Sequence, residues 1–494
     1  MVMAKIPKRG SSGSNKIPIE IKGFAGINKN HTRKNSQSSI GKNFYTKNGA
    51  LFTRPGLVEI SDPPSVTAPI YSIHSCKQAQ LTERLIVQSG SELHHRTDES
   101  GPWALLASSV SGYAYGIVWR DHLILSFGAK VLDYSIDTAS ASDLRGGATD
   151  MPGCLFTATW KDFLWTIPGP NWAPAYKTQF NGYQYEPVDP EVPDGEQRIV
   201  DRDIIEWPEE YNVPMSDGTS LMAAFPFGSS LFCITGASTW HIYGNNEDDF
   251  EVHQGSRVGA YENGDFCPAA LVADMPMWLG NDHKVYRYTG SVVEPISQPI
   301  DELLEDEFAV AGLKPRVYSL DNKFWLFMLR NISVGQDDEE TANCYVYDPA
   351  EREWYLYEFA GHILSAGIYD GKIHLGTKAG KVLVMDDTVV TDNTADVTTS
   401  LTLGPINMQG RDMNVKTLHL TADPKNDIDI AVYYSVDGGD EVSQGTVSFE
   451  EGVLSTQDIR VSAKGKNISL RLESTDKVDE LQSATLTVVP KKLK

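Results

Sequence analysis

From about residue 57 onward, the chain alternates short apolar runs, rich in β-branched and aromatic residues, with Gly, Asn and Asp. This pattern is typical of antiparallel strands joined by tight turns. Seven runs recur, at residues 85, 123, 163, 231, 277, 324 and 373, with spacings of 38, 40, 68, 46, 47 and 49 residues. Because a propeller blade repeats every ~40 to 50 residues, these spacings predict a β-propeller of six to eight blades. Apart from the one long gap of 68 residues, the spacing is regular, and a tandem set of unrelated sandwiches would not be expected to hold it so evenly.

The 68-residue gap contains an insertion, residues 169–218, that is rich in Pro and acidic residues. This composition disfavours both helix and central strand, so we expect a long excursion from one blade. Long loops on rigid scaffolds often carry function, and Trp172 and Trp207 are the candidate interface residues of this one. A solvated decoration without function is the alternative for the same segment.

One stretch, residues 297–311, has helical periodicity, and its apolar positions are Ile300, Leu303, Leu304, Phe308 and Ala311. It predicts a short amphipathic helix on a blade edge. The polar stretch after Met385 predicts a domain boundary, which divides a propeller at residues 57–390 from a C-terminal domain at 391–494. Six or seven alternating strands in that domain predict a small antiparallel β-sandwich, so the fold class is all-β.

Charge is distributed unevenly between the N-terminal segment and the rest of the chain. The 494 residues carry a net charge of −23, but residues 1–49 hold ten Lys or Arg and one acid, which leaves −32 on the remainder. Residues 1–56 also lack a sustained period, so we expect an extended basic arm that orders only against a partner. The acidic body argues against a protein that grips nucleic acid through a general basic surface.

The sequence contains no readable catalytic or metal-binding signature. It has no G-x-S-x-G, no H-E-x-x-H and no complete P-loop, and its five cysteines form no C-x-x-C pair, which favours reduced core thiols. We therefore predict neither an enzyme nor a cofactor. No apolar run reaches the ~18 residues of a membrane-spanning helix. The charged first residues do not resemble a signal peptide, so we expect a protein that is made in the cytoplasm.

Two other function classes are compatible with a propeller. One is a glycan-binding or glycan-cleaving protein, in which Trp172 and Trp207 stack on sugars, although cleavage would need a carboxylate pair that one sequence cannot reveal. The other is a propeller scaffold for intracellular partners, which the missing WD-type signatures disfavour.

Four stretches, in order along nearly the whole chain, carry a resemblance to a known family. They are Asn43-Phe44-Tyr45 with the Arg-Pro-Gly turn of Leu51 to Leu57, the hairpin Phe227 to Tyr243, the strand Cys344 to Asp348 leading to Glu353-Trp354, and the closing strands Ile468 to Val488. In these stretches the chain resembles the packaged-DNA stabilization, or tail nozzle, proteins of short-tailed bacteriophages, as found in Salmonella phages. The acidic insertion and the marked basicity of the arm depart from the family pattern.

The resemblance implies a virion structural protein of the phage tail, assembled in the host cytoplasm. It would form a homo-hexameric ring below the portal and its adaptor ring, extend the DNA channel, and offer a docking surface to tail fibre or needle proteins. An acidic channel wall would let double-stranded DNA slide during ejection, since many Lys and Arg contacts would retard it. In the basic arm, Lys29, Arg33 and Lys34 are the candidate contacts to the adaptor or a neighbouring subunit, and a solvated tail is the alternative.

Overall fold

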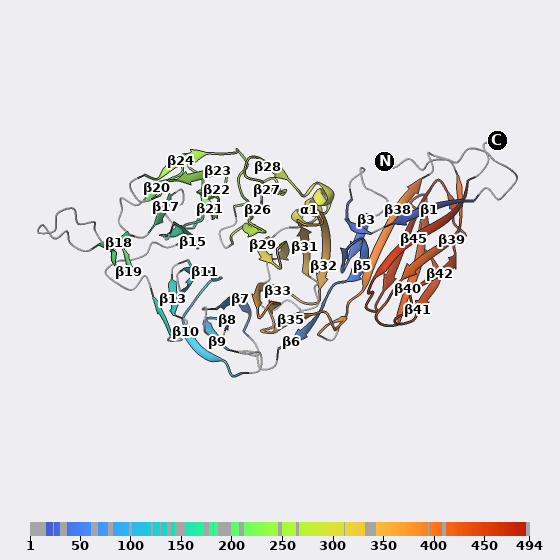
Figure 1. Ribbon diagram of the computed structural model, residues 1–494, viewed down its shortest axis with the longest axis horizontal. Helices are drawn as coiled ribbons and strands as arrows, with labels where there is room; N and C mark the ends of the chain where they lie inside the picture. Colours follow the sequence, from blue (N-terminus) through green and yellow to red (C-terminus); the bar gives the residue numbers. More distant parts are fainter. Residues whose placement is uncertain are drawn as a thin grey trace, which may run out of the picture.

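The computed structural model consists of a ring of radial β-sheets beside an elongated two-sheet sandwich (Figure 1). It describes residues 16–22, 24–29, 37–60, 68–77, 83–97, 101–119, 122–128, 130–135, 140–143, 154–161, 163–171, 177–180, 182–185, 199–206, 212–245, 249–262, 266–310, 312–330, 342–393, 395–407 and 412–490. The all-β class predicted from the sequence is confirmed.

The ring is a β-propeller of seven antiparallel blades. The first three blades contain β7 (Ile70–Cys76), β8 (Arg84–Ser89), β9 (Glu92–Arg96) and β10 (Ala104–Ser108); β11 (Tyr115–Trp119), β12 (His122–Ser126), β13 (Val131–Ser135) and β14 (Ser140–Asp143); and β15 (Phe156–Trp160), β16 (Phe163–Ile167), β17 (Lys177–Phe180) and β20 (Asn212–Pro214). The next three contain β21 (Leu221–Phe227), β22 (Ser230–Thr235), β23 (Thr239–Tyr243) and β24 (Glu251–Gln254); β25 (Ala269–Val272), β26 (Met275–Leu279), β27 (Val285–Tyr288) and β28 (Val293–Pro295); and β29 (Leu313–Leu320), β30 (Lys323–Arg330), β31 (Ala342–Asp348) and β32 (Glu353–Phe359).

The seventh blade joins two distant parts of the chain. It contains β33 (Ile363–Tyr369), β34 (Lys372–Thr377), β35 (Val382–Asp386) and, from the N-terminal side, β6 (Gly56–Glu59). The short strands β36 (Thr391–Asp392) and β37 (Ala395–Asp396) extend the same sheet. A Cβ on Gly56 would lie 2.6 Å from the carbonyl oxygen of Thr391, so the close approach of β6 requires glycine here. The pairing of β6 with β35 closes the ring.

The seven apolar runs found in the sequence are the second strands of the seven blades: β8, β12, β16, β22, β26, β30 and β34. Their central residues are buried because each second strand lies between a paired strand on either side and neighbouring blades on both faces. The predicted β-propeller is thereby confirmed, and its seven blades lie within the predicted six to eight.

The acidic insertion is only partly an excursion. Its β17 and β20 supply the two outer strands of the third blade, with Trp165 paired to Phe180 across β16 and β17. Between them, β18 (Gly182–Tyr185) and β19 (Ile199–Glu206) form a separate two-stranded sheet. The excursion is therefore the hairpin of β18 and β19, inserted between two blade strands (Figure 1).

The predicted helix is present, but it is shorter than the stretch 297–311 that shows helical periodicity. A 3-10 turn, η2 (Gln298–Ile300), leads into α1 (Asp301–Phe308), whose Leu304 is fully buried. The Glu307 carboxylate accepts hydrogen bonds from Asn343 Nδ2, at 2.5 Å, and from the Tyr345 hydroxyl, at 3.3 Å. These contacts hold α1 against the sixth blade.

The sandwich consists of two sheets that share a core. The strands of one are β1 (Ile17–Lys22), β4 (Phe44–Lys47), β5 (Ala50–Thr53), β39 (Met413–Ala422), β42 (Ser455–Arg460), β43 (Lys464–Gly465) and β45 (Leu481–Pro490). Those of the other are β2 (Ala25–Ile27), β3 (Gln37–Lys42), β38 (Thr399–Asn407), β40 (Ile428–Val436), β41 (Val442–Phe449) and β44 (Asn467–Ser474). Alternate residues of β39 and β44 are buried, as expected for inner faces of a sandwich.

The N-terminal segment differs from the expected extended arm. In its described part, β1 to β5 are strands of the sandwich, and β1 pairs with β45 along six residues. The reason is an apolar pattern that the basic composition obscured, since Ile21, Phe24 and Ile27 are at most 3% exposed. The propeller is thus inserted into a sandwich built from both ends of the chain.

Candidate functional site

Lys29 lies within the described chain, directly after β2. Its ammonium nitrogen is 3.4 Å from Asp306 Oδ2 and 3.8 Å from Glu302 Oε2, both on α1. Ion pairs as exposed as these contribute little to stability, so Lys29 remains available for another partner. Its predicted contact with an adaptor stays a prediction. The other four predicted contact residues lie outside the described residues: Arg33, Lys34, Trp172 and Trp207.

Arg54, in the Arg-Pro-Gly turn, is buried where the sandwich meets the propeller. Its Nη1 and Nη2 donate to the two carboxylate oxygens of Asp392, at 2.9 and 2.5 Å. Its Nε donates to Asn43 Oδ1 at 2.9 Å, and Nη2 also donates to the carbonyl of Glu358 at 2.6 Å. The guanidinium carbon lies 4.4 Å from the ring centre of Phe359. This residue is therefore part of the joint between the two domains.

A cavity of about 530 Å³ lies at the centre of the propeller. Its walls are the first strands of all seven blades: β7, β11, β15, β21, β25, β29 and β33. These strands converge on the axis, so small residues are needed where backbones meet. A Cβ on Gly367 would lie 2.5 Å from the carbonyl oxygen of Ile73, for example. Cavities of this size are typical of sites for small molecules.

Arg316, on β29, supplies the charge of this cavity. The residue is only 3% exposed, and its guanidinium carbon lies 3.4 Å from the ring centre of Tyr113 and 4.1 Å from that of Phe266. Its Nη1 donates a hydrogen bond to the carbonyl of Leu364. Its Nε and Nη2 have no hydrogen-bond partner among the described residues. One edge of a buried guanidinium is therefore unsatisfied.

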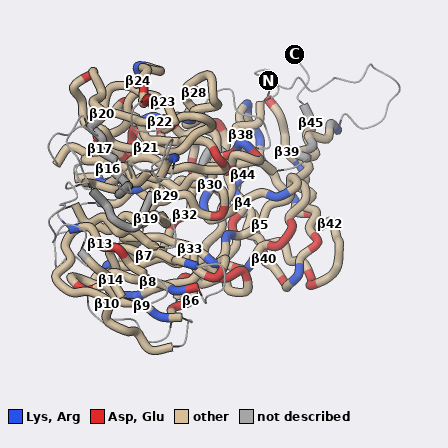
Figure 2. The backbone as a smooth tube through the Cα atoms, turned by 60° about the vertical axis from the view of Figure 1, so that its left-hand side comes forward, with Lys and Arg blue, Asp and Glu red and all other residues tan. Residues whose placement is uncertain are grey.

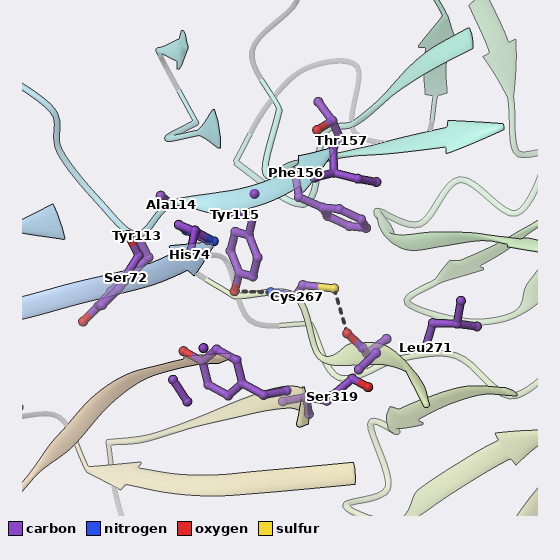
Figure 3. Close-up of a pocket in the computed structure, with 18 of the residues that line it drawn as sticks. Ser72, His74, Tyr113, Ala114, Tyr115, Phe156, Thr157, Cys267, Leu271 and Ser319 are labelled. Carbon is purple, nitrogen blue, oxygen red and sulfur yellow. Dashed lines mark hydrogen bonds between the residues drawn. The ribbon is translucent and has the colours of Figure 1, made fainter. Parts of the chain in front are cut away.

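The other polar groups of the cavity are neutral at pH 7. Burial lowers the pKa of His74 to about 4, and the buried Nε2 of this ring has no hydrogen-bond partner in the described chain. Burial also raises the pKa of Tyr115 well above its ordinary value. Figure 3 shows Tyr115 reaching across the cavity to the backbone of Cys267, whose amide donates to its hydroxyl at 2.6 Å. The histidine and the tyrosine therefore add no charge to the cavity.

The charge of the cavity contrasts with that of the whole protein. Acidic residues occur along loops and strands of both domains, interspersed with basic ones (Figure 2). Among the lining residues in the described ranges, however, there is no Asp, Glu or Lys. Arg316 is therefore an isolated positive charge inside a chain of net charge −23.

One feature of the sequence indicates this cavity, an arginine within an apolar strand, and it belongs to no known motif. Arg316 lies within Leu313–Leu320, between apolar residues of a strand, where an unpaired arginine is unusual. No spacing rule connects it to Tyr113 or Phe266, which are about 200 and 50 positions upstream. Only the propeller geometry brings the three together.

No group of three or more His, Cys, Asp or Glu residues in the described ranges is arranged to hold a metal ion. All five cysteines are buried and free, as the sequence predicted. Burial raises the pKa of the Cys76 and Cys267 thiols to about 12. Within the part of the chain that the structure describes, no helix has the length and apolarity to cross a membrane.

Comparison with known proteins gives a likeness of fold. The sequence matches no protein-family model and no curated protein. BamB from Moraxella catarrhalis is 9% identical, with a TM-score of 0.38 over 69% of this chain and 93% of that protein. The Pan2 WD40 domain of Neurospora crassa is 9% identical, with a TM-score of 0.36 over 67% and 94%. An exo-β-1,3-galactanase from Phanerochaete chrysosporium is 8% identical, with a TM-score of 0.24 over 88% and 100%.

Proposed function

We propose that the protein is a structural component of a short phage tail, a nozzle subunit that forms a homo-hexameric ring below the portal and adaptor. In this role it retains packaged DNA, extends the channel for ejection and carries tail fibre or needle proteins. It acts by assembly and not by catalysis. The resemblance of four sequence stretches to the tail nozzle family is the origin of this proposal.

The observation that supports it best is the interlocked construction of the subunit. From β1 onward, the chain forms strands of the sandwich, closes the propeller through β6, completes seven blades and returns to the sandwich. The two domains also touch directly, since a Cβ on Gly26 of β2 would lie 2.2 Å from the carbonyl oxygen of Trp354 in β32. A subunit built in this way keeps its two domains in a fixed relation. A tube that must withstand the pressure of packaged DNA requires such subunits.

In this proposal, DNA passes along the axis of the ring, between subunits. The cavity at the propeller centre has the volume of a small-molecule site and not of a duplex conduit. The surplus of acidic residues would then act on DNA from the surfaces that face the ring axis. Repulsion at these surfaces lets the duplex slide, and it predicts weak retention of free DNA that does not decrease as the salt concentration is raised.

The proposal is tested by the assembly state of the purified chain, alone and mixed with an adaptor ring. Negative-stain electron microscopy and analytical ultracentrifugation should show closed rings with the adaptor. The triple substitution of Lys29, Arg33 and Lys34 by alanine should weaken that assembly, with the surface variant Lys416→Ala as a matched control. A chain that stays monomeric with the adaptor would contradict the proposal.

A further inference from the structure

A second cavity, of about 690 Å³, lies where the sandwich meets the seventh blade of the propeller. The sandwich supplies the hairpin of β4 and β5, the first residues of β45 and the loop residues 425 and 477–480, and the propeller supplies Asp387, directly after β35. Figure 1 shows β5 on the side of the sandwich that faces the propeller. We call this space the junction cavity. Small-molecule sites occur preferentially between domains, and its volume lies within their usual range.

Two aromatic rings line the junction cavity. Tyr45 and Phe52 are paired across β4 and β5, and they alternate with the core residues Phe44 and Leu51, so they lie on the outer face of the sheet. Outer faces of sandwiches usually carry polar residues. Both rings are only partly buried, and they stack with their centres 5.4 Å apart. The Lys323 ammonium lies 5.8 Å from the centre of the Tyr45 ring, so Phe52 is the ring on which a ligand can pack.

The polar groups around these rings are accessible and uncommitted. Lys47, Asn48, Asp387 and Lys425 are exposed, and their side chains have no hydrogen bond or ion pair with another described residue. The Tyr45 hydroxyl also lacks a hydrogen-bond partner in the described ranges, and it is not one of the fully buried unpartnered atoms. Burial and the charge of Asp387 raise the pKa of Tyr45 to about 12, so this hydroxyl stays a donor at pH 7.

The backbone that carries these groups is held in place before any ligand binds. The hairpin turn is Asn48-Gly49, with φ angles of 53° and 79°, the two-residue turn that matches the twist of paired strands. The amide of Phe24 donates to the carbonyl of its glycine at 2.6 Å. On the propeller side, the Asp386 carboxylate accepts from the amide and the hydroxyl of Thr388, at 2.7 Å each, which fixes the turn that bears Asp387. A fixed site reduces the entropy lost on binding.

The charges of the junction cavity are balanced. Its lining residues include three lysines and three acids: Lys47, Lys425, Lys477, Asp387, Asp479 and Glu480. A polyanion such as a nucleotide therefore gains no net attraction here. A hydroxyl group can donate to a carboxylate and accept from an ammonium or amide, so a ligand with many hydroxyls suits this mixture. The apolar C–H face of a sugar ring can in addition pack on an aromatic side chain.

We propose that the junction cavity is a binding site for one sugar ring of a glycan, packed on Phe52 and hydrogen-bonded through its hydroxyl groups to Lys47, Lys425 and Asp387. The site binds and does not cleave. It is separate from the proposed tail function, because it lies within one subunit and needs no ring.

The proposal is tested by saturation-transfer difference NMR on the full chain at pH 7, without an adaptor. The probes are the methyl glycosides of glucose, galactose, mannose and N-acetylglucosamine, with deoxyadenylate as a ligand that offers a stacking ring and a phosphate. We expect saturable transfer to the ring protons of at least one glycoside, and none to deoxyadenylate. No transfer to any of the four glycosides, or transfer to deoxyadenylate alone, would overturn the proposal.

Variants show whether the signal comes from this cavity. The double substitution Lys47→Ala with Asp387→Asn should weaken glycoside binding roughly tenfold or more, because hydrogen bonds to charged groups are lost. Lys416→Ala with Asp440→Asn, at exposed residues elsewhere on the sandwich, makes the same change of charge and should leave binding unchanged. Phe52→Leu keeps an apolar side chain, removes the ring and should also weaken binding. Equal binding by the natural chain and by either cavity variant would show that the sugar lies elsewhere.

Discussion

Arg54 and Asp392 form a buried ion pair whose side chains are 0% and 5% exposed. Removing one partner from such a pair leaves the other as an uncompensated charge, which costs more than an exposed pair contributes. The guanidinium also donates to Asn43 and to the carbonyl of Glu358, so its position determines how the sandwich meets the seventh blade. Its role is therefore stabilisation of the joint.

The first prediction concerns this pair. Asp392→Ala should lower the free energy of unfolding by about 3 to 5 kcal/mol, because Arg54 then stays buried without a counter-charge. The measurement is urea denaturation followed by fluorescence. Lys42→Ala, which breaks a half-exposed pair with Glu358, is the control and should cost less than about 1 kcal/mol. Equal effects of the two substitutions would mean that burial of the pair is unimportant.

The second prediction concerns pH. The pKa of His74 falls from 6.5 to about 4 on folding, so below pH 6.5 the unfolded state binds a proton that the folded state does not. Stability should therefore decrease as pH falls from 6.5 to 4, by roughly 3 kcal/mol from this residue. The cavity's other ionisable residues are arginine, cysteine and tyrosine, types that ordinarily titrate above pH 8.

The measurement is the unfolding free energy between pH 4 and 7 for the natural chain and for His74→Asn. The variant should show a shallower loss on acidification, and His253→Asn, at an exposed histidine, should match the natural chain. Identical slopes for all three proteins would show that His74 is not buried as described.

At the scale of elements, the turn between β22 and β23 is organised by a single carboxylate. Asp217, just before β21, accepts hydrogen bonds from Thr235 Oγ1 at 2.5 Å, Trp240 Nε1 at 3.2 Å and the Thr219 amide at 3.0 Å, and from the Ser238 hydroxyl. Burial alone would raise the pKa of Asp217, but these hydrogen bonds lower it below its ordinary value. Asp217, which lies outside the hairpin Phe227 to Tyr243, thus fixes the turn of that hairpin.

The third prediction follows from that network. Asp217→Ala should destabilise the protein by roughly 2 to 3 kcal/mol, because several donors lose a charged acceptor at once. Thermal and urea unfolding at pH 7 measure the effect. Asp282→Ala, which removes a more exposed carboxylate bonded to Tyr286, should cost clearly less. A smaller loss for Asp217→Ala than for the control would contradict the account of the turn.

The fourth prediction separates the N-terminal strands from the residues before them. Deleting residues 1–15 removes Lys5, Lys8 and Arg9 but leaves β1 and its pairing with β45, so the unfolding temperature should not change. Deleting residues 1–40 removes β1, β2 and most of β3 and should unfold the sandwich. Circular dichroism with limited proteolysis tests both. Of the two deletions, only the shorter one leaves the sandwich intact, so it can show whether Lys5, Lys8 and Arg9 contribute to assembly.

The sequence allowed the buried second strand of every blade to be predicted, because runs such as Leu85-Ile86-Val87 are apolar and, apart from one long gap, recur at a regular spacing. The first strands were harder to detect. They converge on the propeller axis and mix small, aromatic and polar residues, as in Ile363–Tyr369. Their sequences therefore show neither the two-residue alternation of a half-buried strand nor a continuous apolar run. Strands β1 to β5 were not predicted because basic residues dominate the composition of their segment. Arg316 was not predicted as a cavity residue because the rings that contact it come from other parts of the chain.

At the scale of the whole molecule, the propeller is closed by a strand from the N-terminal side and inserted into a sandwich made by both ends of the chain. Such a subunit has no free hinge between its domains in the described residues, since the chain crosses the joint twice and Arg54 connects both crossings. The proposed role, in which such subunits surround an axis through which DNA moves, requires a rigid and acidic subunit of this kind.

In the proposed function, copies of this subunit close into a ring. Cryo-electron microscopy of the full chain mixed with an adaptor ring tests it most directly. We expect particles with six-fold symmetry, an open axis, and the propeller and sandwich in the same relation in every subunit. A field of single subunits under the same conditions, with the adaptor ring intact beside them, would contradict the account.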